Sequence, residues 1–504
     1  MSETELCPFD IFFAECIMQR FQLSDESIKD RLIQLMNGAR MGDVCTTLDQ
    51  SLPDKLLESG AFVEHEKQTY FQRNWILETH LIDPLLKLFD GAVEEGLQVP
   101  SDLLHSLNTE QQQAVKQSLT SKLFILSGGP GTGKTFTARR IIEAHIATSD
   151  KPLRIALAAP TGKAVSKLKQ SLEGVKDALP ITASTLHTLL GIKRSSDFLK
   201  KPKCLSFDVI LIDECSMIDM ALWTVLLRSL LPHTKLILLG DVHQLPSVEP
   251  GHVFEDLWKV VQNKRKTCGV ELKQSMRTES MALLTLANKV KLGESDSSVI
   301  FAQLPSEDTL IQAISPQFTE VLKHEIDQKV LVENQILCGL RQGPFGVDRL
   351  NAKIFNHITL ACKPGDRLAI PILLTRNAPD LDLCNGQMGI WVHQVHPETQ
   401  KHLPHPKDYV LFDERDPLPF SLLPPHELAY AISVHKSQGS EYDRVHFLMP
   451  PGSERFGRKM LYTAITRARQ QLIIYGSTET YHQSIAFSGH RTSGLANRLL
   501  KLLK

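Results

Sequence analysis

A glycine-rich loop between an apolar run and a helical pattern is the feature that most constrains how this chain can fold. Residues 128–135 read Gly-Gly-Pro-Gly-Thr-Gly-Lys-Thr and satisfy the phosphate-binding pattern G-x-x-x-x-G-K-[ST]. The apolar run 123–126 before the loop predicts a buried parallel strand, and residues 136–142 after it predict a helix. In this setting the backbone N–H groups of the loop and the helix N-terminus hold phosphate oxygens. The chain is therefore expected to bind a nucleoside triphosphate.

The same loop predicts the roles of individual residues. We expect Lys134 to reach the β- and γ-phosphate oxygens, and Thr135 to offer its hydroxyl to Mg²⁺. The remaining residues predicted to bind the triphosphate are Gly128, Gly129, Pro130, Gly131, Thr132 and Gly133.

A pair of acidic residues follows a second apolar run. Residues 209–212 read Val-Ile-Leu-Ile, which predicts a buried strand, and Asp213 and Glu214 come directly after it. A surface turn can also carry two acids, but a buried strand downstream of a phosphate loop makes a hydrolytic site the better interpretation. We expect Asp213 to hold Mg²⁺ through its water shell, and Glu214 to orient and deprotonate the attacking water.

Two glutamines are candidates for contacts with the nucleotide, because an amide both donates and accepts hydrogen bonds. Gln111 precedes the phosphate loop and could bind the adenine edge, although a glutamine on a helix is more often solvated. Gln244 follows the apolar run 236–239, which places it at the same edge of the predicted sheet, where it could contact the γ-phosphate.

Composition restricts the class of protein without identifying it. A hydrophobic content of 42%, a charged content of 22% and a net charge of −1 are typical of a globular protein with no overall basic surface. The nine cysteines include no C-x-x-C pair and no zinc-like cluster, which favours free thiols and a cytoplasmic location. The N-terminus is acidic and no apolar run approaches ~18 residues, so neither a signal peptide nor a membrane span is expected.

Residues 1–105 lie too far before the phosphate loop to join its sheet and are predicted to form a small helical domain. A helical pattern runs from Trp75 to Leu88 and is interrupted at Pro84. An earlier helix has one apolar face, formed by Phe9, Phe12, Phe13, Cys16 and Ile17. Such a domain could pack on the rest of the chain or could dock a partner protein, and both alternatives require apolar helix faces.

Residues 106–280 and 281–504 are predicted to form two successive α/β units. The second unit has a small β insertion near 390–425 and carries Arg467 on a helix, but it has no phosphate loop. This combination favours one triphosphate site in the cleft between the units, with an arginine donated across the cleft. Arg277 follows a strand-like segment and, considered alone, would be assigned to the surface.

Taken in order, these motifs resemble those of superfamily-one helicases and, within them, of the RecD branch. The resemblance extends from Leu107 to Arg469 and includes two pieces typical of RecD-like proteins, residues 341–346 and 434–441. It implies an α/β fold with two RecA-like P-loop motor domains, a small helical N-terminal domain and an SH3-like β insertion. It also implies an ATP-dependent helicase that moves 5′ to 3′ on single-stranded DNA and acts at duplex ends.

The resemblance implies roles for matching residues. Gln111 would recognise adenine, Gln244 would sense the γ-phosphate, and Arg277 and Arg467 would close over it. The residues expected to act in ATP hydrolysis are Lys134, Asp213, Glu214, Gln244, Arg277 and Arg467, with Thr135 and Asp213 as the Mg²⁺ ligands. The residues expected to contact DNA, mostly through its phosphates, are Thr161, Thr185, His187, His435, Lys436 and Gln438.

Residues 191–207 correspond to a short version of the strand-separating insertion of this family. The insertion is basic, which suits a DNA contact and suits a solvated loop equally well. Its charged residues are Lys193, Arg194, Lys200, Lys201 and Lys203 against Asp197.

No carboxylate cluster suited to a nuclease stands out in the sequence, so DNA cleavage is expected to belong to a partner. The resemblance implies the α subunit of an exodeoxyribonuclease V complex in double-strand break repair and recombination. Its partners would be RecB-like and RecC-like subunits in a heterotrimer. A stand-alone RecD-like helicase is one alternative, and a non-catalytic docking subunit clamped by ATP is another. A nucleotide kinase or a GTPase is disfavoured by the second α/β unit.

Overall fold

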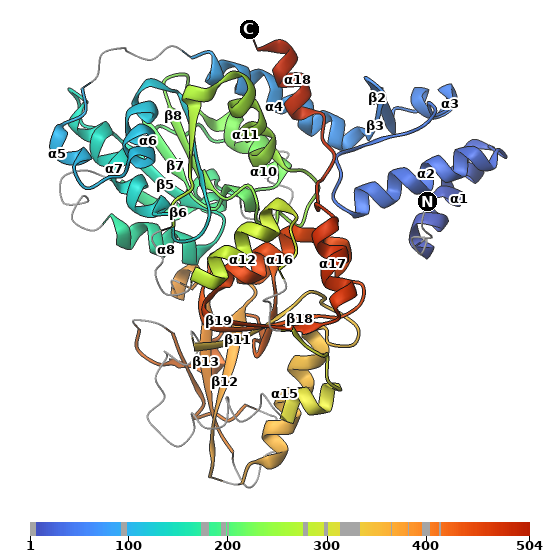
Figure 1. Cartoon of the computed structure of the whole chain (residues 1–504), viewed down its shortest axis with the longest axis vertical. Helices are drawn as coiled ribbons and strands as arrows, with labels where there is room; N and C mark the ends of the chain where they lie inside the picture. The colour runs from blue at the N-terminus through green and yellow to red at the C-terminus, as the bar shows by residue number, and fades with distance from the viewer. Residues whose placement is uncertain are drawn as a thin grey trace.

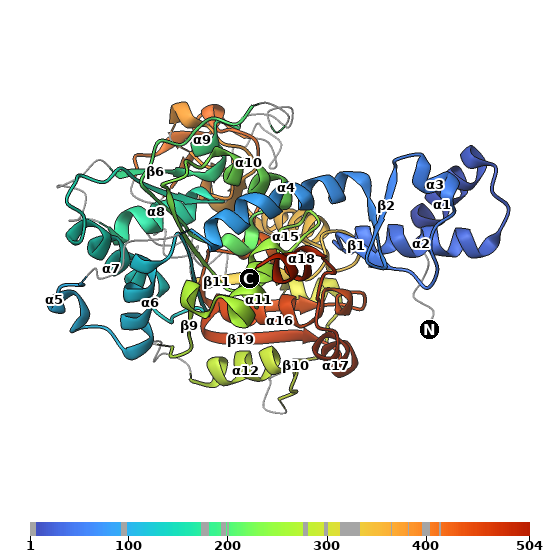
Figure 2. The same cartoon turned by 90° about the horizontal axis from the view of Figure 1, so that it is seen from above.

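The computed structural model describes residues 7–91, 98–172, 181–192, 198, 201–275, 281–296, 301–312, 333–363, 365–381, 383–395, 404–412 and 415–503. Two units, each with a central sheet, lie one above the other along the long axis, and the N-terminal segment projects to one side (Figure 1). Seen from above, the first helices extend well away from both units (Figure 2). Within the described part of the chain, no helix is long and apolar enough to cross a membrane.

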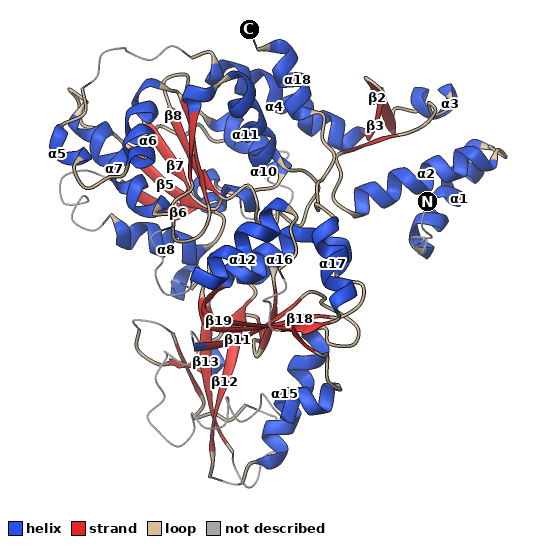
Figure 3. Cartoon of the chain, in the orientation of Figure 1, coloured by secondary structure: helices blue, strands red, loops and turns tan. Residues whose placement is uncertain are grey.

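The first unit, here called motor domain 1, contains a six-stranded parallel sheet with the order β6-β5-β7-β8-β4-β9. Its strands are β4 (Leu123–Gly128), β5 (Ile155–Ala159), β6 (Ile181–Thr185), β7 (Val209–Ile212), β8 (Lys235–Gly240) and β9 (Gly269–Leu272). The strands predicted before the phosphate loop and before the acidic pair are confirmed as β4 and β7. Both are buried along their whole length, because helices cover the two faces of the sheet (Figure 3).

Helices form a layer on each face of this sheet. One layer comprises α6 (Thr109–Thr120), α7 (Lys134–Ala147) and α8 (Gly162–Ser171), which share a core with β4 and β5. The other comprises α9 (Leu186–Leu190), α10 (Met220–Ser229) and α11 (Val253–Lys264). A short helix, α5 (Ser101–Leu104), precedes α6.

Two helices from opposite ends of the chain complete the second layer. The helices α4 (Gln72–Phe89) and α18 (Leu495–Leu502) pack beside α10 and α11, and Leu81, Leu85 and Leu499 are completely buried there. The domain boundaries predicted at 105 and for 281–504 therefore differ from the observed core, which takes helices from both outer segments. Apolar periodicity indicates that a helix has a buried face but does not indicate which unit covers it.

The helix α4 also continues through Pro84, where the sequence predicted an interruption. A proline in a helix interior removes a hydrogen bond and costs about 3 kcal/mol. Its neighbours Ile82 and Leu85 are both buried in the core, and burying side chains of this size stabilises the fold by about 1.5–3 kcal/mol each. Tertiary packing therefore outweighs the local cost of the proline.

The N-terminal lobe, residues 7–71, is mixed rather than purely helical, so the prediction of a helical domain is wrong in this respect. Its helices are α1 (Pro8–Phe21), α2 (Glu26–Arg40) and α3 (Asp54–Glu58). Its antiparallel sheet has the order β1-β3-β2, formed by β1 (Cys45–Thr47), β2 (Phe62–His65) and β3 (Gln68–Phe71). The β2–β3 turn places Glu66 and Lys67 at φ +51° and +66°. Asn and Gly usually mark such turns, so the sequence carried no hairpin signal.

The second unit, motor domain 2, contains a five-stranded parallel sheet with the order β10-β19-β18-β11-β17. Its strands are β10 (Phe301–Ala302), β11 (Asn334–Cys338), β17 (Ala431–Ser433), β18 (Tyr442–Met449) and β19 (Ala468–Gly476). Its helices are α12 (Met281–Leu292), α15 (Val347–Ala361), α16 (Gly457–Arg467) and α17 (Thr478–Ala486). The expected second α/β unit without a phosphate loop is thus present in the described residues.

A five-stranded antiparallel sheet is inserted into motor domain 2, with the order β15-β14-β13-β12-β16. Its strands are β12 (Arg367–Leu374), β13 (Met388–Gln394), β14 (Tyr409–Leu411), β15 (Leu418–Pro419) and β16 (His426–Leu428). The predicted range of 390–425 was too short, because β12 begins at Arg367. The apolar run of residues 368–374 contains Pro371, and because a proline argues against a strand interior, the sequence did not indicate β12.

Candidate functional site

The phosphate loop follows β4 and leads into α7 at the edge of the sheet where the parallel strands end. Gly131 and Gly133 adopt φ +73° and +83°, a left-handed backbone that favours glycine. The ammonium of Lys134 donates to the carbonyl oxygens of Gly128 at 2.6 Å and Gly129 at 3.0 Å. The lysine head therefore lies over the loop, at the place where the loop would hold phosphate oxygens.

A cavity of about 280 Å³ opens in front of this loop, and both motor domains line it. Most of the predicted hydrolytic residues meet there. From motor domain 1 these are Lys134, Thr135, Asp213, Glu214 and Gln244, and from motor domain 2 it is Arg467, beside Gly439 and Glu441. Arg277 lies outside the described residues, so its predicted role has no structural counterpart here.

The acidic pair at the end of β7 adopts an unusual backbone. Asp213 is buried, and its Oδ1 accepts a hydrogen bond from the backbone N–H of Glu214 at 2.8 Å. Glu214 itself has φ +53° and ψ +42°, which is strained for a residue with a side chain. Burial and the neighbouring Asp213 raise the pKa of Glu214, against the opposing charges of Arg467 and Lys134. A carboxylate with a raised pKa is better able to accept a proton.

The donor set of the cavity suits a magnesium ion. The Thr135 hydroxyl and the Asp213 carboxylate line the same space as Lys134. Mg²⁺ prefers oxygen ligands and usually takes one or two carboxylates together with substrate phosphates and water. The two predicted ligands therefore fit this ion in type and in location.

Gln244 is held by a contact between the domains. Its Nε2 donates to Asp241 Oδ2 at 3.1 Å, and the hydroxyl of Tyr462 on α16 donates to the same oxygen at 2.9 Å. Among the described residues, the buried Oε1 of Gln244 has no hydrogen-bond partner. The free atom is thus an acceptor, which suits a water molecule better than a phosphate oxygen.

Arg467 ends α16 and is only 3% exposed. Its Nη1 donates to the carbonyl oxygen of Ser440 at 2.9 Å, and its Nε to that of Thr463 at 3.3 Å. The Arg467 side chain therefore lines the cavity, and its guanidinium is fixed to Ser440, in the loop that follows β17.

Gln111 lies behind the phosphate loop. Its Oε1 accepts from the N–H of Asn108, and Asn108 Oδ1 accepts from the N–H of Gln111, which makes a capping box at the start of α6. The residue is 2% exposed, and a Cβ added at Gly133 would lie 2.8 Å from its Nε2. Gln111 does not line the 280 Å³ cavity, and its predicted contact with adenine stays a prediction.

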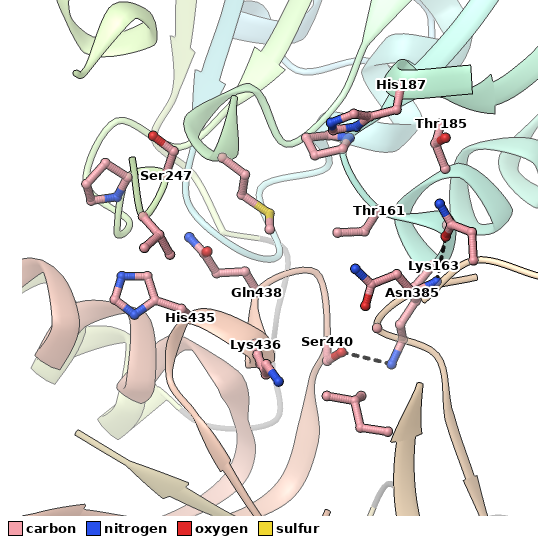
Figure 4. Close-up of a pocket in the computed structure, with 18 of the residues that line it drawn as sticks. Thr161, Lys163, Thr185, His187, Ser247, Asn385, His435, Lys436, Gln438 and Ser440 are labelled. Carbon is pink, nitrogen blue, oxygen red and sulfur yellow. Dashed lines mark hydrogen bonds between the residues drawn. The ribbon is translucent and has the colours of Figure 1, made fainter. Parts of the chain in front are cut away.

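A second, larger cavity of about 650 Å³ lies between the two motor domains and the inserted sheet (Figure 4). All six residues predicted to contact DNA line it: Thr161, Thr185, His187, His435, Lys436 and Gln438. Ile192 and Phe198 of the predicted strand-separating insertion line it as well. Residues 193–197, 199 and 200 of that insertion lie outside the described part of the chain.

Sequence reasoning missed several lining residues. Asn377, Asn385 and Gly386 reach the cavity from the loop between β12 and β13, and Ser247 and Val248 reach it from the segment after β8. A local pattern could not have identified them, because their position depends on how the inserted sheet packs against motor domain 1.

The polar groups of the larger cavity differ in their hydrogen bonds to the protein and in their charge. Thr161 and Thr185 cap α8 and α9 by accepting from backbone N–H groups. Burial lowers the pKa of His187, and burial with the charge of Arg491 lowers the pKa of His435 to about 4. Both histidines are therefore neutral at neutral pH.

Two predicted DNA contacts already have protein partners. The Lys436 ammonium pairs with the carboxylate of Glu427 on β16. The Gln438 Nε2 donates to the Leu245 carbonyl oxygen at 2.7 Å, so this amide joins the two motor domains. Gln438 is therefore a contact between domains in this structure, in addition to being a wall of the cavity.

One short segment belongs to both cavities. Gln438 and Ser440 line the larger cavity, and Gly439 and Glu441 line the smaller one. Ser440 also accepts a hydrogen bond from Lys163 of motor domain 1 at 3.0 Å. We call residues 438–441 the shared loop, because a movement of it changes both cavities together.

Family models match the two motor domains separately. Residues 111–250 match a model described as an AAA domain, and residues 428–475 match a model described as a UvrD-like helicase C-terminal domain. The first match contains the phosphate loop and the acidic pair, and the second contains the shared loop and Arg467.

Curated proteins give a longer match. The chain is 32% identical over 471 residues to RecBCD enzyme subunit RecD of Mycolicibacterium smegmatis, covering 85% of this chain and 82% of that protein. It is 28% identical to ATP-dependent RecD2 DNA helicase of Deinococcus radiodurans, covering 79% of this chain and 53% of that protein. A solved structure of Pif1 helicase from Candida albicans aligns with a TM-score of 0.44 and 19% identity, over 79% of this chain and 99% of that one. The likeness to that structure is too low to add to the sequence matches.

The left-handed backbone of Glu214 predicts that replacing this residue by glycine stabilises the fold and lowers activity. Glu214→Gly should raise the free energy of unfolding by about 1 kcal/mol, because glycine adopts a left-handed backbone without strain. The same change should lower ATP hydrolysis at least ~100-fold if the carboxylate acts as the general base. Denaturant unfolding and steady-state ATPase assays measure the two effects. Ser216→Gly, at a neighbouring position without positive φ, should gain no stability; an equal gain there would contradict the strain.

Proposed function

The chain belongs to the RecD family of ATP-dependent DNA helicases, and from that premise we propose that it hydrolyses ATP to move 5′ to 3′ along single-stranded DNA. The observation that carries this proposal is the shared loop, which forms a wall of the cavity at the phosphate loop and a wall of the larger cavity between the domains. One cavity would take ATP and the other the DNA strand.

In the smaller cavity the phosphates of ATP would lie on the phosphate loop under Lys134. Thr135 and Asp213 would hold Mg²⁺, which neutralises developing charge on the phosphates. Glu214 would take the proton of the attacking water, and the free Oε1 of Gln244 would accept a hydrogen bond from that water. Arg467 would stabilise charge from the opposite side, a role worth roughly 10³–10⁵ in rate in comparable sites.

The grip on ATP and the grip on DNA would change together. Arg467 holds the Ser440 carbonyl oxygen, and Ser440 in turn accepts from Lys163. When Arg467 moves to meet the γ-phosphate, the shared loop would move with it and would change the shape of the larger cavity. Repeated closing and opening of the two domains would shift the strand along that cavity.

Contacts with DNA would be mostly to its backbone. Lys163 and Lys436 supply positive charge in the larger cavity, and Thr161 and Thr185 supply hydroxyl groups. Because His187 and His435 are neutral, they would act through hydrogen bonds or stacking on bases rather than through charge. This arrangement distinguishes a strand by its backbone and does not read its sequence.

We further propose that the chain acts as one subunit of a helicase–nuclease complex with RecB-like and RecC-like partners in the cytoplasm. The similarity to RecBCD subunits covers more of both chains than the similarity to RecD2. The N-terminal lobe also presents the side chains of Phe9 and Phe12, which are 56% and 62% exposed on α1. A stand-alone helicase is the alternative. A clamp without catalysis is disfavoured because Glu214, Gln244 and Arg467 line one cavity.

ATPase and unwinding assays test the motor. Wild-type hydrolysis should rise strongly with single-stranded DNA, and Lys134→Ala should abolish it, because the ammonium is the main cation at the phosphates. Duplexes with a 5′ overhang should be unwound and those with only a 3′ overhang should not. DNA-independent hydrolysis, or unwinding only from 3′ overhangs, would overturn the proposal.

A carboxylate beside the larger cavity predicts a gain of affinity. Glu427 pairs with Lys436 and faces Arg341 at 3.5 Å, so DNA phosphates must compete with it. Glu427→Gln should tighten binding of single-stranded DNA about fivefold, the equivalent of the ~1 kcal/mol of an exposed ion pair. The slope of log affinity against log salt should also steepen by about 0.7.

Fluorescence anisotropy with a labelled oligonucleotide measures both quantities. Glu307→Gln is the matched control, because Glu307 pairs with Arg349 and Lys353 and does not line the cavity. If Glu427→Gln weakens binding, the carboxylate positions Lys436 for DNA instead of competing with it.

The N-terminal lobe can be tested for docking without truncating the chain. Deletion of residues 1–105 would remove α4 from the core of motor domain 1, so point variants are needed. Phe9→Ser combined with Phe12→Ser should reduce capture of purified RecB-like and RecC-like subunits in a pull-down and should leave ATPase unchanged. Leu360→Ser, which changes a side chain 72% exposed on motor domain 2, is the control. Undiminished capture by the double variant would show that α1 is not the docking surface.

A further inference from the structure

A guanidinium from the C-terminal segment closes a loop of motor domain 1. Arg491 Nη1 lies within hydrogen-bond distance of three carbonyl oxygens, those of Ser247 at 2.8 Å, Glu249 at 2.8 Å and Gly251 at 3.2 Å. We call residues 245–251 the sensor loop. A single cation that bonds three carbonyls of one loop fixes the shape of that loop, and the Ser247 hydroxyl, which also donates to the Glu249 carbonyl oxygen at 3.1 Å, adds to this.

The sensor loop lines the larger cavity and contacts motor domain 2. It begins directly after Gln244, which lines the smaller cavity, while Ser247 and Val248 line the larger one. Its first residue, Leu245, donates its N–H to Thr463 Oγ1 at 2.9 Å and accepts from Gln438 at 2.7 Å. Its position therefore bears on the cavity assigned to DNA and on the contacts between the two motor domains.

The N-terminal lobe holds the same guanidinium from the other side. Gly42 has φ +94°, and a Cβ added there would lie 2.3 Å from Arg491 Nε, so a larger residue would displace the arginine. The carbonyl oxygen of Gly42 accepts from the N–H of Gly251, and Asp43 Oδ1 accepts from the N–H of Thr492 at 2.6 Å. The lobe, the C-terminal segment and the sensor loop thus meet around one side chain.

The charge of Arg491 persists in this junction. Burial lowers its pKa to about 10, with Asp43 and Glu249 acting in the opposite direction, so the group is positive at neutral pH. Its field also reaches the larger cavity, where it helps to lower the pKa of His435.

We propose that Arg491 is a positioning residue through which the N-terminal lobe controls the DNA-dependent step of ATP hydrolysis. The proposal rests on the motor function given above and adds a route for its regulation. A protein docked on the lobe would move residues 42–44, the guanidinium would follow, and the sensor loop would change its contacts with Gln438 and with the DNA cavity. The site of regulation is therefore separate from the residues that perform hydrolysis.

DNA-stimulated ATPase of the full chain tests this role. In Arg491→Ala the concentration of a thymidine oligonucleotide that gives half-maximal stimulation should rise about 2- to 30-fold, the range found for residues that couple two sites. Hydrolysis without DNA and the KM for ATP should stay unchanged. Arg491→Lys should restore part of the response, because an ammonium keeps the charge but cannot reproduce the planar guanidinium.

A pair of glycines in the lobe gives a matched test that leaves the arginine in place. Gly42→Ala should reproduce the effect of Arg491→Ala, because the added methyl group displaces the guanidinium. Gly60→Ala is the control, since Gly60 has φ +71° but an added Cβ would meet only the Gln72 amide at 3.7 Å. Both alanines carry backbone strain, and only one of them reaches Arg491. If Arg491→Ala fails to fold, this pair decides the question.

The outcomes separate this inference from the motor function. If wild-type hydrolysis does not respond to DNA, the motor proposal fails. The inference fails if the wild type responds to DNA and the variants Arg491→Ala and Gly42→Ala need the same oligonucleotide concentration as the wild type for half-maximal stimulation. Arg498→Ala loosens the same C-terminal segment at its contacts with Glu78, 3.1 Å away, and with the ring of Trp75. If it produces the same change in DNA response, the effect is loss of segment docking and the role of Arg491 is wrong.

Discussion

Lys134 of motor domain 1 and Arg467 of motor domain 2 line one small cavity, and the arrangement of the two domains depends on bringing these cations together. Lys134 and Arg467 would repel each other if they were brought together alone, and the carboxylates of Asp213 and Glu214 line the same cavity and offset their charge. The cleft is held closed by hydrogen bonds that Tyr462, Thr463 and Gln438 make to motor domain 1. Under the proposed function, completing the hydrolytic site and joining the domains would be the same event, and a chemical step at one cavity would be transmitted to the rest of the chain through these contacts.

The sequence was informative where function depends on a contiguous segment. The phosphate loop, the acidic pair after β7 and the arginine at the end of α16 were all predicted, because each is a short motif at the end of one element. What could not be predicted depends on packing between distant segments: the positions of α4 and α18 in the core of motor domain 1, and the approach of Asn377 and Asn385 to the larger cavity. That Gln244 keeps a free Oε1 could not be predicted either, because the bonds among Gln244, Asp241 and Tyr462 determine which amide atom has no partner.

Among the residues that the structure describes, the larger cavity is weakly charged for a site assigned to a polyanion. The two histidines described there are neutral, and Lys436 is paired with Glu427. A strongly basic groove would hold each phosphate in a deep energy minimum, and a strand would then step slowly from one register to the next. Modest charge with several hydroxyl and amide groups would make successive registers similar in free energy, as the proposed movement along a strand requires.

The return of the C-terminal segment to motor domain 1 also has a consequence during synthesis. Leu495 and Leu499 of α18 are fully buried against α4 and α11, so the hydrophobic face they cover stays exposed until α18 itself has left the ribosome. Motor domain 2 must therefore emerge while its predecessor is still incomplete, and the two domains cannot mature strictly one after the other. A nascent chain of this kind would present an apolar surface to chaperones from the synthesis of α4 until residues 495–502 have been translated.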